Sequence, residues 1–381
     1  MDLTANWSYP TEIRFGPGRI VELIEVCKTL GISKPLFVTD KGLMRLQSTI
    51  NIIQNLKENN IFGGYFSNLN SNPNEGHLAE GIDLLKQEKN DGVIAFGGGS
   101  ALDLGKLIAF MSYQTRPVWD FEDVSDWWKR ARTDQILPII AVPTTAGTGS
   151  EVGRASVITN LKSKQKKIIF HPQILPKVVI CDPELTLCMP KHITAGTGMD
   201  AFAHCLEAYC SPNFHPMSQG IALEGMRLIK ENLNVVYSDG TNLFSRTQMM
   251  AAATMGATAF QKGLGAIHSL SHPIGAIYSA HHGTLNAVLM SEVLLFNKDF
   301  IYKKIELLCH YLEISGGFNG FLDFINGMNT SLKIPAKLSE LEIDESNIEK
   351  IVSDALVDPS SGSNPRVMDK SNIRKLFMNC L

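Results

Sequence analysis

The pattern of hydrophobic positions in the first half of the chain alternates between two kinds of segment. Short β-rich runs at 35–39, 92–96 and 136–142 each end in turn or capping residues, which is typical of strands. Between them, segments 18–30 and 78–88 carry apolar residues at three- and four-residue spacing, which predicts helices. Because strands and helices alternate, the sequence predicts a parallel sheet with helices on both faces.

The second half of the chain has a different pattern. After about Pro190, long segments rich in Ala, Met, Leu and Gly dominate, and convincing β runs vanish. We therefore predict an α/β domain over residues 1–185 and an all-α domain over residues 186–381. The polar stretch 358–365 is interpreted as a surface loop. Helical spacing of apolar residues in the second half predicts helices over 194–210, 217–232, 246–262, 264–278, 284–296, 299–312 and 318–328.

Composition and charge narrow the class of protein. The 35 Lys and Arg residues nearly balance the 38 Asp and Glu residues, so no excess of positive charge draws the chain to nucleic acid or an anionic membrane. No apolar stretch approaches the roughly 20 residues of a membrane-spanning helix, and the first residues lack a secretory signal, so we expect a cytoplasmic location. The seven cysteines are scattered without a CxxC pair, which indicates reduced thiols.

A glycine-rich turn follows the run 92–96. Gly97, Gly98 and Gly99 allow backbone N–H groups to approach a ligand closely, and the N-terminus of the helix that follows favours an anion. We predict that Ser100 caps this helix and that Asp103, three positions later, completes a capping box. The turn therefore predicts a phosphate site, with a tight turn that binds no ligand as the alternative.

A second loop of this kind, at 143–151, follows the run 136–142. It contains Thr144, Thr145 and Thr148 at the end of a predicted strand, where open α/β sheets bind their ligands. Neither loop is the GxGxxG fingerprint, so the pattern does not predict a standard Rossmann domain. Asp40, at the end of the run 35–39, either accepts a hydrogen bond from a ribose hydroxyl and repels a 2′-phosphate, or simply begins a loop.

Histidines and one aspartate form a candidate metal site. Asp200 and His204 are four residues apart, His268 and His272 repeat this spacing, and His282 follows. On a helix, this spacing places two side chains on one face. A carboxylate with neutral imidazoles suits Fe²⁺ or Zn²⁺, and an open position on the ion can polarise a carbonyl or alcohol oxygen. Each histidine by itself is more often a core or surface residue than a metal ligand.

Four motifs together carry a resemblance to a known family. They are GGGSALDLGK at 97–106, PTTAGTGSEV at 143–152, DPELTLCMPKHITAGTGMDAFAHCLEAY at 182–209 and GLGAIHSLSHPIGAIYSAHHG at 263–283. The motifs stand in the order and approximate spacing that are found in the iron-containing (group III) alcohol dehydrogenases. The chain resembles this family over nearly its whole length. The resemblance implies an N-terminal dinucleotide-binding domain, a C-terminal helical domain and a divalent metal in the cleft between them.

The resemblance also implies roles for individual residues. Asp200, His204, His268 and His282 match the metal ligands, and His272 matches a histidine that lines the site, where we predict a catalytic role in proton exchange. His281 departs from the family pattern and could change the polarity of the substrate site or add a ligand. The positions that match cofactor contacts are Asp40, Asn72, Gly97, Gly98, Gly99, Ser100, Asp103, Thr144, Thr145, Thr148 and Lys167.

The activity that the resemblance implies is hydride transfer between NAD(H) and a small alcohol or aldehyde whose oxygen is polarised by Fe²⁺ or Zn²⁺. NADP(H) is the less favoured cofactor, because Asp40 would repel its 2′-phosphate. The resemblance further implies a homodimer or larger homo-oligomer. Two alternatives remain open: a dehydroquinate synthase-like lyase, which also uses NAD and a metal but has a glutamate ligand where this chain has Asp200, and a non-catalytic metal- or nucleotide-binding protein.

Overall fold

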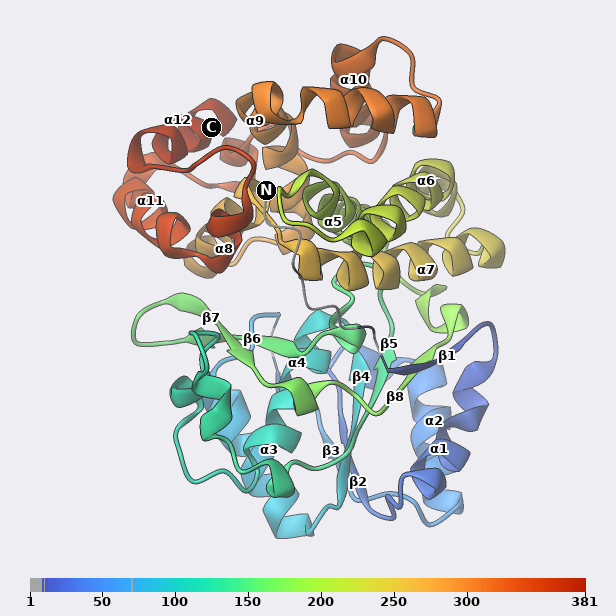
Figure 1. Ribbon diagram of the computed structural model, residues 1–381. Helices are drawn as coiled ribbons and strands as arrows, with labels where there is room; N and C mark the ends of the chain where they lie inside the picture. The colour runs from blue at the N-terminus through green and yellow to red at the C-terminus, as the bar shows by residue number, and fades with distance from the viewer. Residues whose placement is uncertain (1–8, 10, 70) are drawn as a thin grey trace. The chain divides into compact units, whose positions relative to one another are not determined.

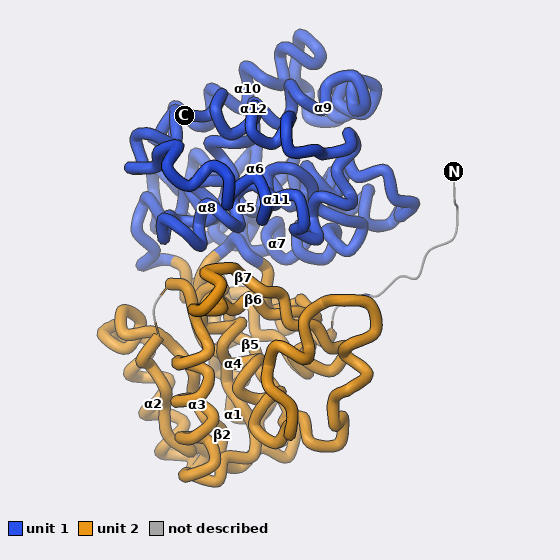
Figure 2. The backbone as a smooth tube through the Cα atoms, turned by 90° about the vertical axis from the view of Figure 1, so that its left-hand side faces the viewer, with its two compact units in different colours: residues 1–9, 146–148, 187–381 blue, residues 10–145, 149–186 orange. Residues whose placement is uncertain are grey.

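The computed structural model describes residues 9, 11–69 and 71–381, which divide into two compact units. Tyr9, 146–148 and 187–381 form one unit, called here the helical unit (blue in Figure 2). The described residues of 11–145 and 149–186 form the other, called here the sheet unit (orange in Figure 2). Each unit is described below by itself.

A six-stranded sheet forms the centre of the sheet unit (Figure 1). Its strand order is β1-β8-β5-β4-β2-β3, and every neighbouring pair is parallel. The predicted runs 35–39 and 92–96 are confirmed as strands β2 and β4, whereas the third run begins as a strand only at Ile139. The strands are β1 (Glu12–Phe15), β2 (Pro35–Val38), β3 (Tyr65–Phe66), β4 (Gly92–Gly97), β5 (Ile139–Pro143) and β8 (Val178–Cys181).

Helices cover both faces of this sheet, as the alternating pattern predicts. On one face, α4 (Gly99–Met111) packs on β4, β5 and β2, and α3 (Glu75–Glu88) packs on α4. On the other face, α1 (Leu23–Thr29) and α2 (Gln47–Glu58) bury apolar side chains in one cluster with residues of β2, β4, β5 and β8. The two faces pack separately because successive strand residues point to opposite sides of the sheet. Outside the sheet, β6 (Ala155–Asn160) and β7 (Gln165–Phe170) form an antiparallel hairpin.

The helical unit is organised around α5 (Lys191–Cys210), which is buried from Thr194 to its last residue and packs against α6, α7 and α9. Within the described residues no strand follows β8, so the predicted all-α second half is confirmed. The described helices do not combine the length and apolar character needed to cross a membrane. The other helices are α6 (Pro216–Ser238), α7 (Leu243–Ala259), α8 (Ala266–Tyr278), α9 (His282–Leu312), α10 (Gly317–Ser331), α11 (Ile348–Val357) and α12 (Lys370–Cys380).

Two sequence-based predictions about the helical unit are wrong. The segments predicted as separate helices, 284–296 and 299–312, form the single helix α9, in which Asn297 between them is buried and hydrogen-bonds to Asn364. Segment 358–365 is not simply a polar surface loop: the Asp358 side chain is only 11% exposed and Asn364 is buried. Both errors arise because polar side chains in these segments find partners on distant elements, which local patterns do not show.

The close approach of α4 to the sheet generates a testable prediction. A Cβ atom on Gly105 would lie 2.7 Å from the Ala95 Cβ and 3.2 Å from the Ala95 Cα. Gly105→Ala therefore forces the helix away from β4, and we expect it to lower the free energy of unfolding by about 1–3 kcal/mol. Urea denaturation of the purified chain measures this change.

The matched control is Gly220→Ala in α6, where a Cβ atom would meet nothing within 4 Å. There the added methyl group only restricts the unfolded chain, so we expect a gain of about 0.4–1 kcal/mol. A loss of stability in both variants would show that the effect does not come from the contact between α4 and β4.

Candidate metal centre and nucleotide-binding loops

Three helices bring the histidines of the candidate metal centre together. Asp200 and His204 lie one turn apart on α5, His268 and His272 lie one turn apart on α8, and His282 is the first residue of α9. In the structure, the Nε2 atoms of three of these histidines face the same oxygen, Oδ1 of Asp200. The distances to this oxygen are 3.8 Å from His204, 3.8 Å from His268 and 3.6 Å from His282.

These distances fit the coordination of one divalent ion. Atoms bound at about 2.0–2.2 Å in a tetrahedron lie about 3.3–3.6 Å apart, so a small inward movement of the side chains closes the set. Ligand atoms of Asp200, His204 and His268 all lie within 4.8 Å of one another, and all three residues are buried. One carboxylate and three imidazoles suit Fe²⁺ and Zn²⁺ equally. The four residues predicted as ligands therefore fit the ion that the sequence motifs imply.

Burial and charge set the protonation of these groups. Burial lowers the pKa of His204 to about 4, so its imidazole is neutral near pH 7. Burial also acts to lower the pKa of His268, but the nearby carboxylates of Asp200 and Glu207 outweigh it and raise this pKa to about 9. Although burial opposes ionisation of Asp200, the surrounding imidazoles hold its pKa below the usual range. The centre thus combines a charged carboxylate with imidazoles that differ in basicity.

His272 lies beside the ligand set and is held by a carboxylate. Its Nδ1 atom lies 2.8 Å from Oδ2 of Asp358, and its ring stacks on that of His282 with centroids 5.3 Å apart. Although burial opposes ionisation of Asp358, the neighbouring His272 and local hydrogen bonds lower the pKa of this carboxyl. An ionised carboxylate only accepts hydrogen bonds, so Nδ1 of His272 carries the proton and Nε2 has a free lone pair when the ring is neutral.

Asn286 is a polar neighbour of the centre that the sequence analysis missed. It lies one turn after His282 on α9 and is fully buried. Its Nδ2 donates to Oδ1 of Asp200 at 2.8 Å and lies 3.2 and 3.3 Å from the Nε2 atoms of His268 and His282. The four-residue spacing from His282 is the signal that could have identified it.

Two carboxylates near the centre were also missed. Glu207 contacts His268 and lies one further turn along α5 from His204, so helical spacing alone could have found it. Asp358 contacts His272 from 86 residues away in the sequence, and no local pattern indicates such a contact. These carboxylates show that the environment of the histidines extends beyond the four predicted ligands.

His281 forms the N-cap of α9. Its Nδ1 atom accepts a hydrogen bond from the Thr284 N–H at 3.3 Å, and its ring lies where a Cβ atom on Gly196 would be. The next residue, Gly283, also approaches α5 closely, because a Cβ atom there would lie 2.0 Å from the Gly196 carbonyl oxygen. Two glycines and a capping histidine therefore set the position of His282.

The glycine turn joins β4 to α4 in the sheet unit. Gly97 has a φ of 148°, a conformation that favours glycine, and Gly98 is the N-cap residue. The predicted capping box is wrong: the helix begins at Gly99, so Ser100 lies within its first turn, and no side chain of the described residues caps this helix end. The first backbone N–H groups of a helix have no partner within the helix, so the N-terminus of α4 is suitable for binding a phosphate.

Ser100 and Asp103 instead connect α4 to neighbouring segments. The Ser100 hydroxyl donates to the Ser71 carbonyl, next to Asn72. Oδ2 of Asp103 accepts from the Val157 N–H of β6 at 3.0 Å. These contacts hold the first turn of α4 in place without using its backbone N–H groups.

The second loop lies beside the glycine turn in the sheet unit. The Thr144 N–H donates to the Gly97 carbonyl at 3.0 Å, and a Cβ atom on Gly98 would lie 3.2 Å from the Thr145 methyl group. Thr148, in contrast, belongs to the helical unit with residues 146 and 147. The structure therefore brings Thr144 and Thr145 to the predicted phosphate site within one unit.

Asp40 and Lys167 have local partners. Oδ1 of Asp40 accepts from the N–H groups of Gly42 and Leu43, as the loop-entry alternative requires. Its Oδ2 lies 3.9 Å from the position of a Cβ atom on Gly97, so the carboxylate also borders the glycine turn. Lys167 lies on β7, where its Nζ pairs with Glu122 at 3.2 Å. The geometry thus associates Asp40, but not Lys167, with the turn.

Comparison with known proteins shows one family. A family model described as iron-containing alcohol dehydrogenase matches residues 10–183, and the model of its C-terminal domain matches residues 194–381. The 4-hydroxybutyrate dehydrogenase of Cupriavidus necator is 36% identical, with 97% of this chain and 98% of that protein covered. The NAD-dependent methanol dehydrogenase of Bacillus methanolicus is 32% identical, with 99% of this chain and 100% of that protein covered.

A solved structure agrees with these relatives. The crystal structure of a 1,3-propanediol oxidoreductase has a TM-score of 0.93 and 31% sequence identity, with 99% of this chain and all of that chain covered. Both family models together span almost the whole described chain, including every element that carries a candidate ligand. The chain therefore belongs to the iron-containing alcohol dehydrogenase family.

Proposed function

We propose that this chain is an alcohol dehydrogenase that interconverts a small alcohol and its aldehyde with NAD(H) and a bound Fe²⁺ or Zn²⁺ ion. The observation that carries the proposal is the convergence of three histidine Nε2 atoms on one oxygen of Asp200. Two relatives also support the proposal. A methanol dehydrogenase described as NAD-dependent and a 4-hydroxybutyrate dehydrogenase are similar to this chain over nearly its full length.

In this proposal Asp200, His204, His268 and His282 hold the metal. The ion would act as a Lewis acid on the substrate oxygen, and the nicotinamide would exchange a hydride with the substrate carbon. The side chains keep the centre partly closed to water, since only His282 among the four has a side chain as much as 25% exposed. Low exposure strengthens the electrostatic interaction of the ligands with a cation.

His272 is the proposed catalytic residue for proton exchange. The Asp358 carboxylate orients the ring through Nδ1 and leaves Nε2 to accept or return a proton. A histidine suits this step because its ordinary pKa lies close to neutral pH.

The sheet unit supplies the proposed nucleotide site. The N-terminus of α4 with Gly97–Gly99 would bind the diphosphate, and Asp40 beside the turn would favour NAD(H) by repelling a 2′-phosphate. We divide the chain accordingly into a nucleotide-binding domain over 1–185 and a metal-binding domain over 186–381. From the family resemblance we also propose a cytoplasmic homodimer or larger homo-oligomer. Further proposed cofactor contacts are Asn72, Ser100, Asp103, Thr144, Thr145, Thr148 and Lys167.

The activity is tested on chain stripped of metal with a chelator and then reconstituted separately with Fe²⁺ and with Zn²⁺. We expect small aldehydes from a panel to oxidise NADH only after an ion is restored. The decrease in NADH absorbance measures this reaction. The control is His204→Ala, which removes a ligand and should stay inactive with either ion. Binding of both metal and NAD without turnover of any aldehyde would favour the non-catalytic alternative.

Cofactor preference is tested with Asp40→Asn, because the amide removes the negative charge but keeps an oxygen for the Gly42 N–H. We expect the ratio of kcat/KM for NADH over NADPH to fall about tenfold, which corresponds to about 1.4 kcal/mol. Asp83→Asn, at an exposed position of α3, is the charge-matched control and should leave the ratio unchanged. Equal use of the two cofactors by the wild type would contradict the role of Asp40.

The role of His272 is tested with His272→Gln. We expect kcat to fall about 10²-fold, because a general acid–base residue is lost, while one metal ion per chain is retained. Steady-state kinetics and metal analysis of the same preparation measure both quantities. Loss of the metal would instead identify His272 as a ligand.

A further inference from the structure

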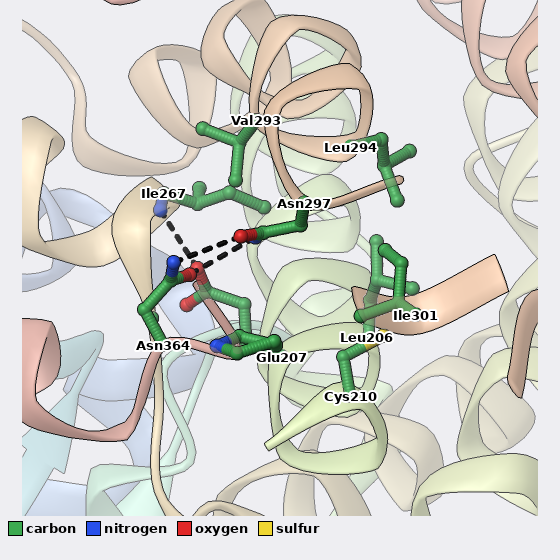
Figure 3. Close-up of a pocket in the computed structure, with 11 residues that line it drawn as sticks. Leu206, Glu207, Cys210, Ile267, Val293, Leu294, Asn297, Ile301 and Asn364 are labelled. Atoms are coloured by element: carbon green, nitrogen blue, oxygen red, sulfur yellow. Dashed lines mark hydrogen bonds between the residues drawn. The ribbon is translucent and has the colours of Figure 1, made fainter. Parts of the chain in front are cut away.

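The helix that carries His268 and His272 is not capped by a residue of its own. The N-cap of α8 is Gly265, which has no side chain to cap the helix. Its first two backbone N–H groups are satisfied from elsewhere in the chain: the Ala266 N–H donates to Asn364 Oδ1 at 3.1 Å, and the Ile267 N–H donates to Glu207 Oε1 at 2.7 Å. The position of this helix end is therefore set by α5 and by the segment before α12. Figure 3 shows the contact between Ile267 and Glu207.

Glu207 makes a second contact, with the side chain of the next residue. Its Oε2 lies 2.6 Å from Nδ1 of His268. A carboxylate only accepts hydrogen bonds, so the imidazole proton stays on Nδ1. The lone pair of a neutral His268 is then on Nε2, which faces Asp200. One carboxylate thus fixes the backbone at the start of α8 and the tautomer of His268.

Burial shields the contact between Glu207 and His268 from water. Glu207 is 6% exposed and His268 is 1% exposed, so water screens their interaction little. A mainly apolar cavity of about 20 Å³, which is room for about one water molecule, borders Glu207 and Ile267 (Figure 3). Asp200 and Glu207 also lie on the same helix, so the carboxylate is connected to a ligand by a rigid backbone.

We propose that Glu207 is a positioning residue of the metal centre, which holds His268 in the orientation and tautomer that a divalent ion requires. The proposal rests on the metal site of the proposed function and adds a residue that acts through a ligand without touching the ion. Histidine ligands commonly donate their second ring N–H to a carboxylate, and loss of that partner typically weakens metal binding by about 10- to 100-fold.

The test is Glu207→Gln, which keeps the size of the side chain but leaves one acceptor oxygen for two donors. The Ile267 N–H cannot give up its proton, whereas the imidazole can change tautomer. We therefore expect the glutamine oxygen to keep the Ile267 contact and its NH₂ group to donate to Nδ1, which moves the ring proton to Nε2. Zn²⁺ affinity, measured by competition with a chelator, should fall about 10- to 100-fold. The Tm of the metal-free protein reports whether the fold is intact.

The matched control is Asn364→Ala, which removes the other acceptor at the start of α8 and leaves the partner of His268 in place. It should lower the Tm of the metal-free protein and leave Zn²⁺ affinity unchanged. Equal losses of affinity in both variants would show that only the helix end matters, and an unchanged affinity in Glu207→Gln would show that the contact has no role; either result overturns the proposal. Failure of the wild type to bind Zn²⁺ or Fe²⁺ would overturn the proposed function itself.

Discussion

The structure of the helical unit depends on a buried negative charge. Asp200 is 2% exposed in the middle of α5, and a carboxylate in that position is costly unless charges and hydrogen bonds compensate it. Compensation comes from the imidazoles of His204, His268 and His282 and from the amide of Asn286. The meeting of α5, α8 and α9 therefore both stabilises the buried carboxylate and assembles a candidate cation site.

The two histidines of α8 share one arrangement. His268 and His272 each direct Nδ1 at a carboxylate, from Glu207 and Asp358 respectively, at 2.6 and 2.8 Å. The two carboxylates come from an adjacent helix and from a segment near the end of the chain. Each ring therefore presents a defined nitrogen toward the centre although it sits on a helix with no cap of its own. The precision of the site comes from these outer contacts as much as from the residues that face the ion.

The sequence predicted those features that depend on local periodicity. Four-residue spacing correctly placed Asp200 beside His204, and alternating strands and helices predicted the parallel sheet. Sequence-based prediction fails where contacts between distant residues determine the structure. Ser100 is predicted to cap α4, yet its hydroxyl donates to the Ser71 carbonyl. Asp358 could not be found for the same reason, since its partner His272 lies 86 residues away. Pairwise spacing identifies side chains on one helix, but it does not reveal which helices meet.

The tight contact between the first turn of α9 and α5 has a consequence for redesign of this enzyme. At Gly283 even a methyl group would overlap the backbone of α5, and at Gly256 of α7 it would lie 3.2 Å from the Cβ of His204. Libraries intended to change substrate preference should leave these positions constant, because larger residues there would displace the backbone of α5 and His204, one of the proposed metal ligands. Substitutions are better introduced on elements whose backbones do not contact the helix turns that carry the proposed metal ligands.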